Sequence, residues 1–81
     1  MTELLSVITQ GVWVAIHRPE PDPAELRDLA TRVEAFAAGE PRLSPDTRTN
    51  LLTALARRVD PATPRDNTAA LRALGLRTEE A

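Results

Sequence analysis

The chain has 81 residues, a formal net charge of −2 and no cysteine. A chain of this length forms one small domain that buries only about 60% of the surface its unfolded form exposes, so a second copy or another partner would add needed stability. The missing cysteines exclude disulfides, thiolate metal sites and a cysteine nucleophile, and the charge lacks the strongly basic character of proteins that bind nucleic acid through phosphates.

The first predicted element is a strongly apolar helix over residues 3–17. One side of that helix carries the large apolar residues Leu5, Ile8, Val12 and Ile16. With the neighbouring apolar positions, this surface wraps most of the way round, which is typical of a helix packed between its own bundle and a partner. The segment is too short for a bilayer-spanning helix of about 20 residues. It also lacks the basic lead of a secretory signal, so we expect a cytoplasmic protein.

A strand over residues 12–17 is the alternative for this segment. Its apolar β-branched residues alternate with Trp13, Ala15 and His17, which is the period of two expected for a strand. No other part of the chain offers a similar alternation, so such a strand would pair with a second molecule. The result would be a dimer like the ribbon-helix-helix proteins, with helices at 23–38 and 45–59 behind the strand.

Trp13 is the only tryptophan in the chain. It fits a large core residue, and it also fits an interface hot spot, a role in which tryptophan is over-represented. Both interpretations of the opening segment place it against a partner or a second copy. The predicted contact residues are Leu5, Ile8, Val12, Trp13, Val14 and Ile16.

Three further helices are predicted from start signals in which an N-cap residue precedes a proline. The signals are "DPAE" at 22–25, "SPDT" at 44–47 and "TPRD" at 63–66, and each places proline where its missing amide hydrogen costs nothing. They predict helices over 23–38, 45–59 and 64–74, with Gly39 and Gly75 as stops. The expected fold is an all-α bundle of about four helices over residues 1–76, oligomeric, with a frayed polar tail at 77–81.

The sequence offers little catalytic chemistry. His17 is the only histidine, and its place near a predicted helix end favours a structural role. The three glycines are isolated, and the carboxylates lack the ligand spacing of a calcium loop. We therefore expect no enzyme activity, no cofactor and no metal site.

A DNA-binding regulator is the main alternative function. Helices 45–59 and 64–74 would form a helix-turn-helix, although their connector "DPATP" lacks the usual glycine-containing turn. The contacts to DNA would come from the more basic half of the chain, through Arg48, Arg57, Arg58, Arg65 and Arg72.

Residues 12–38, "VWVAIHRPEPDPAELRDLATRVEAFAA", resemble the epsilon-type subunits of acyl-CoA carboxylases from high-GC bacteria. The resemblance implies a short extended start, a proline-containing link, a helix and a role as an accessory subunit of an enzyme complex. It covers about a third of the chain, and residues 39–81 lack the family's glycine- and tryptophan-containing tail. The use of arginine for all ten basic residues also suits a GC-rich coding sequence.

The function that these patterns favour is a noncatalytic protein–protein interaction module. It would be either a homodimeric adaptor or a small regulatory subunit that docks on a larger protein. Its contacts would bury apolar side chains at the centre of an interface, with arginine and carboxylate groups at the rim.

Overall fold

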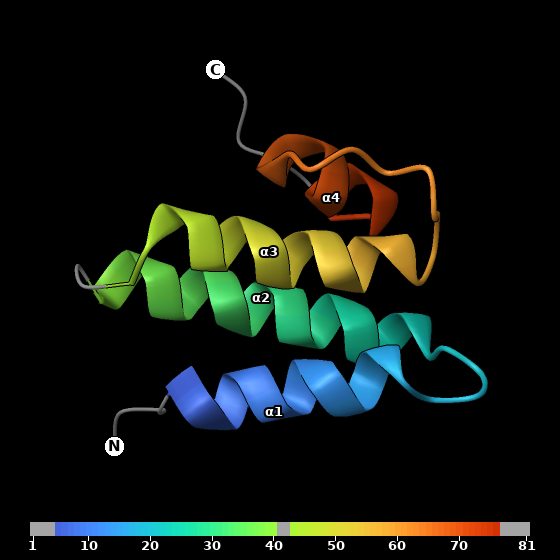
Figure 1. Cartoon of the computed structure of the whole chain (residues 1–81), viewed down its shortest axis with the longest axis horizontal. Helices are drawn as coiled ribbons and strands as arrows, with labels where there is room; N and C mark the ends of the chain where they lie inside the picture. The colour runs from blue at the N-terminus through green and yellow to red at the C-terminus, as the bar shows by residue number, and fades with distance from the viewer. Residues whose placement is uncertain (1–4, 41–42, 77–81) are drawn as a thin grey trace.

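A computed structural model describes residues 5–40 and 43–76, and the elements in these residues are all helical. The helices are α1 (Leu5–Ile16), α2 (Pro23–Gly39), α3 (Pro45–Arg57) and α4 (Asn67–Ala73). Figure 1 shows α1, α2 and α3 running lengthwise beside one another, with the short α4 on the side of α3 away from α1. The predicted all-α fold of four helices is confirmed.

The helical interpretation of the opening segment is correct and the strand alternative is wrong, because residues 12–16 lie within α1. Ile8, Val12 and Ala15 are all buried on one face of the helix. A strand would point Val12 and Ala15 to opposite sides. Other residues of the same chain therefore bury this face of α1. A ribbon-helix-helix dimer would instead pair the segment with a second molecule.

The starts of α2 and α3 follow the cap signals in the sequence. The Oδ1 atom of Asp22 accepts a hydrogen bond from the backbone N–H of Ala24 at 3.1 Å. In the same way, Ser44 Oγ accepts from the N–H of Asp46 at 3.1 Å. Each cap precedes a proline in the first turn, so both helices begin at the predicted residue.

The predicted start of the fourth helix is wrong by three residues. Thr63 does not cap a helix, because its hydroxyl donates to the carbonyl oxygen of Asp60 at 2.6 Å. Asp66 is the cap instead, and its Oδ2 atom accepts from the N–H of Ala69 at 2.9 Å. The proline of "TPRD" therefore lies in the connector, and α4 begins at Asn67. The tail predicted at 77–81 lies outside the described residues.

A single apolar core holds the helices together, and α3 is its centre. This helix packs against α1, α2 and α4. A Cβ atom added at Gly11 would lie 3.2 Å from Leu29 Cδ2, so α1 and α2 approach closely at this glycine. Each helix contributes side chains to the buried core, which contains Ile8, Val12, Ala15, Leu26, Leu29, Ala30, Val33, Leu51, Leu52, Leu55, Ala56, Ala70 and Leu74.

None of the helices in the described parts of the chain is long and apolar enough to span a bilayer.

Replacing Thr53 by valine is expected to stabilise the protein by about 1 kcal/mol, because a buried hydroxyl without a partner carries a desolvation cost. Thr53 is only 4% exposed, and its Oγ1 atom has no hydrogen-bond partner. Thr49→Val on the same helix is the matched control, since Thr49 Oγ1 donates to the carbonyl oxygen of Pro45 at 3.0 Å. Urea denaturation measures the stability of both variants. An equal loss of stability in the two would contradict the expectation.

Candidate interaction surface

Within residues 5–40 and 43–76, one side of α1 is not covered by the other helices. Helix α1 packs against α2 and α3, and the residues on its opposite side form the surface that we call the outer face of α1: Ser6, Val7, Thr9, Gln10, Trp13 and Val14. Val7 is 50% exposed, Trp13 60% and Val14 47%. Among the described residues, the one other large apolar side chain with comparable exposure is Val59. The exposed apolar side chains are therefore concentrated on α1.

Helix α1 also lacks charge. Its sequence, "LSVITQGVWVAI", contains no aspartate, glutamate, lysine or arginine, although charged residues make up 27% of the chain. The polar groups that the outer face presents are the hydroxyls of Ser6 and Thr9 and the amide of Gln10. These neutral groups can form hydrogen bonds without the large desolvation cost of an ion.

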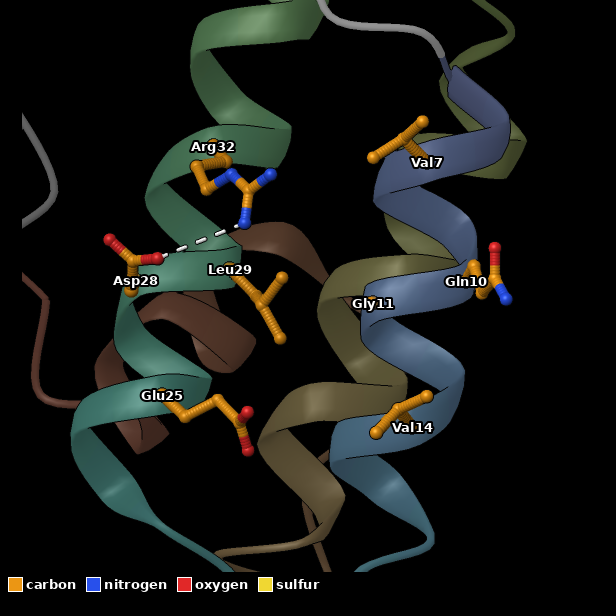
Figure 2. A pocket seen from close by; sticks show the side chains of 8 residues that line it. All are labelled: Val7, Gln10, Gly11, Val14, Glu25, Asp28, Leu29 and Arg32. Carbon is orange, nitrogen blue, oxygen red and sulfur yellow. Dashed lines mark ion pairs between the residues drawn. The ribbon is translucent and has the colours of Figure 1, made fainter.

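Two shallow hollows lie along this helix. The larger, of about 620 Å³, is on the outer face itself and is lined by Leu5, Ser6, Thr9, Gln10, Trp13 and Val14. The smaller, of about 380 Å³, lies between α1 and α2. In Figure 2, Leu29 points from α2 toward α1 at its centre, and the ion pair of Asp28 and Arg32 borders it on α2. The outer face thus combines shallow hollows lined partly by apolar side chains with a border of paired charges on α2.

Trp13 is held in place by His17, one helical turn later. The two rings are stacked, with centroids 3.7 Å apart and an angle of 16° between their planes. His17 Nδ1 lies 2.8 Å from the carbonyl oxygen of Trp13, to which it donates a hydrogen bond. The stacking limits the rotamers of Trp13 before any partner arrives, which lowers the entropy lost on binding. The structural role predicted for His17 therefore includes orienting the tryptophan.

The charges that border the outer face are compensated within the chain. Arg18, beyond the end of α1, forms a bidentate ion pair with Glu25 of α2, with distances of 2.6 and 2.9 Å. The hydrogen bonds from Arg18 lower the pKa of the Glu25 carboxyl below its ordinary value, and burial opposes them. Asp28 and Arg32 form the next ion pair along α2.

The predicted contact residues divide between this surface and the core. Trp13 and Val14 are exposed on the outer face, and Leu5 and Ile16 are half-buried at its border. Ile8 and Val12, by contrast, are 0% and 2% exposed and pack inside the bundle. In the folded chain they are core residues, because α2 and α3 cover the face of α1 from which they project.

Sequence reasoning missed four residues of the outer face: Ser6, Val7, Thr9 and Gln10. Val7 and Val14 are two helical turns apart and share one edge of α1, and this spacing was the available signal. The signal was ambiguous because apolar residues surround most of the helix. The contacts with α2 and α3 were needed to separate the inner from the outer residues.

Two of the arginines predicted to contact DNA are paired at the start of α3. Arg48 Nε donates to Glu34 Oε1 at 2.9 Å, and its NH2 group bonds the other carboxylate oxygen. These hydrogen bonds raise the pKa of Arg48 above its ordinary value. Arg65 donates to Asn50 Oδ1 at 3.0 Å and pairs with Asp46. Both guanidinium groups thus hold elements of the bundle together.

The other three predicted DNA contacts lie elsewhere. Arg57 Nε donates to the carbonyl oxygen of Thr63 at 2.9 Å and supports the connector before α4. The NH2 group of Arg58 donates to the carbonyl oxygen of Arg18 at 2.8 Å, which ties the end of α3 to the α1–α2 connector. Arg72 is exposed on α4. The five arginines are therefore spread over both ends of α3, the connector before α4, and α4 itself.

The part of the chain that the structure describes contains no cluster of metal ligands. Within residues 5–40 and 43–76, no group of three or more histidine, aspartate or glutamate side chains is arranged to hold a metal ion. The chain has no cysteine to add to such a group.

The resemblance to the epsilon-type carboxylase subunits is weakened by the fold. The extended start that it implies at residue 12 is absent, since residues 12–16 belong to α1. The proline-containing link and the following helix are present, as the segment from His17 to Asp22 and as α2. Scans against protein-family models, curated proteins and solved structures each found no match to this chain.

Proposed function

We propose that this protein is a noncatalytic protein–protein interaction module that docks through the outer face of α1, either as a homodimeric adaptor or as a small regulatory subunit of a larger protein. A cytoplasmic location is part of the proposal. The observation that carries it is a helix without charge whose large apolar side chains Val7, Trp13 and Val14 are about half exposed. Contiguous exposed apolar surface of this kind marks interaction sites in soluble proteins.

The composition of the outer face supports docking rather than simple exposure. The tryptophan on this face supplies a large contact area at low entropic cost, and its stacking on His17 restricts it in advance. Hydroxyl and amide groups surround it, and ion pairs on α2 form the border. Large apolar side chains together with polar groups and a charged border are the usual composition of a protein–protein interface.

The two alternatives lack a comparable observation. A DNA-binding surface would need a continuous basic patch, whereas the candidate arginines are dispersed and several are engaged in contacts within the chain. An accessory role in a carboxylase complex would be one form of the docking subunit, but no feature of the outer face favours that partner. We therefore propose neither.

A photo-crosslinking amino acid at Gln10 tests the proposed docking. Gln10 is exposed in the middle of the outer face, so a bound protein would lie within reach of the reactive group. Irradiation of cells that produce the full chain is expected to give adducts of discrete mass. Arg72, exposed on α4 on the far side of α3, is the matched control position and is expected to give none. Absence of adducts at position 10, or equal labelling at both positions, would overturn the proposal.

A further inference from the structure

We propose that the outer face of α1 is occupied by the same face of a second copy of this chain, with the two α1 helices antiparallel. The inference rests on the proposed function, because it names the partner of the docking surface described above. It commits the module to self-association and predicts the residues that meet at the twofold axis.

The chemistry of α1 requires an uncharged partner surface. A charged side chain buried against this helix would lose its hydration without gaining a counter-ion, since α1 has no charged residue. The ion pairs at its border, such as Arg18 with Glu25, are already formed within the chain. The helices α2, α3 and α4 all carry charged residues. Among the four helices, α1 is thus the one without charged residues, so α1 of a second copy matches the uncharged surface of the first copy.

The spacing of the residues around the larger hollow is self-complementary. Its lining consists of Leu5, Ser6, Thr9, Gln10, Trp13 and Val14. These positions have the same spacing when read from either end, and the midpoint lies between Thr9 and Gln10. A twofold axis through that midpoint superimposes the two hollows along their whole length. Closed, twofold pairing through one surface patch is the commonest arrangement of homo-oligomers.

Side-chain size agrees with this register. Trp13, the largest residue of the outer face, comes opposite Ser6 of the second copy, the smallest. The Gln10 side chains of the two copies meet beside the axis, where their amides can donate to and accept from each other. Antiparallel alignment also places the negative end of each helix dipole beside the positive end of the other. A parallel pair would instead bring the two Trp13 side chains to the same level.

The contact is small, which sets the expected affinity. A helix of twelve residues is about 18 Å long at 1.5 Å per residue. Pairing through one face of such a helix falls below the size of a standard stable interface. The dimer is therefore expected to be weak and reversible, with dissociation in the micromolar range or above.

Single-cysteine variants test the register directly, because the chain has no cysteine of its own. Gln10→Cys is expected to form a disulfide-linked dimer under mild oxidation. Ser6→Cys is expected to form no disulfide across the dimer, since the two copies of residue 6 are separated by seven residues, or about 10 Å along the helix axis. Ala35→Cys, on the exposed side of α2, is the control for random collision. Linkage of Ser6→Cys in preference to Gln10→Cys, or equal linkage of all three variants, would overturn the antiparallel pairing.

Sedimentation equilibrium of the purified full chain, from about 10 µM to about 1 mM, tests the association itself in the range expected for a small interface. Trp13→Ala is expected to weaken dimerisation by at least about 30-fold, as an aromatic hot spot present twice in the interface. Ser6→Asp, at an exposed position, is expected to abolish the dimer by placing a carboxylate without a counter-ion against Trp13 of the other copy. Circular dichroism would show that both variants remain folded.

The outcomes separate the two proposals. A wild-type chain that stays monomeric throughout, together with no disulfide at Gln10→Cys, overturns self-pairing. If the photo-crosslinker at Gln10 then still captures a different protein in cells, the docking function stands with another partner. If it captures nothing, the proposed function fails as well.

Discussion

Leu52→Ala is expected to lower the free energy of unfolding by about 3 kcal/mol, within the range for truncation of a buried leucine. Leu52 is 0% exposed and lies on α3, which packs against α1, α2 and α4. The caps and short connectors hold these helices in place, so the surrounding side chains can fill only part of the cavity. A chain of this length has a total stability of only about 4–12 kcal/mol, so the loss is a large fraction of it.

Chemical denaturation followed by circular dichroism measures this effect. Val59→Ala is the matched control, because Val59 is 47% exposed beyond the end of α3. Its truncation is expected to change stability by less than about 0.5 kcal/mol. A similar loss in both variants would contradict the central position of Leu52 in the core.

Gly75→Ala is expected to destabilise the protein by about 1–2 kcal/mol, the cost of a left-handed backbone for a residue with a Cβ atom. Gly75 has φ of +79° and follows the end of α4. Its N–H donates to the carbonyl oxygen of Arg72 at 3.0 Å, and the next N–H, from Leu76, donates to that of Leu71 at 2.9 Å. This pair of bonds is the Schellman motif, which satisfies carbonyl groups at the end of a helix.

Gly39→Ala is the control for the same chemical change at another helix end. Gly39 ends α2 without a positive φ, and a Cβ atom there would have no neighbour within 4 Å. We expect this variant to be neutral or up to about 1 kcal/mol more stable, since alanine favours the helix over glycine. Thermal denaturation of both variants, with hydrogen exchange at the Leu74 amide, distinguishes them. Equal effects would show that the backbone conformation at Gly75 is not the cause.

Local signals in the sequence were enough to place most helix ends. Asp22 and Ser44 act on backbone groups two residues away, and Gly75 acts within one turn of α4, so their roles do not depend on distant residues. The start of α4 was wrong because Thr63 has a second local partner, the carbonyl oxygen of Asp60. A sequence pattern does not rank two such competing hydrogen bonds.

The candidate surface was predictable only in part. Composition singled out Trp13 and Val14, which are exposed, but it grouped them with Ile8 and Val12, which are buried. The difference depends on which side of α1 meets α2 and α3. A helix that is apolar nearly all round gives no strong periodic signal for that choice.

The sequence by itself determined that helices follow Asp22 and Ser44, because helix capping and proline placement act on neighbouring residues. The tertiary structure decided that residues 12–16 are helical and that Val7 and Gln10 join Trp13 on an uncharged outer face. It also showed that four of the five candidate arginines bond groups of the same chain, as Arg48 does with Glu34. These results depend on contacts between residues far apart in the chain. Burial on one side of α1 leaves the other side exposed, and only packing selects which side that is.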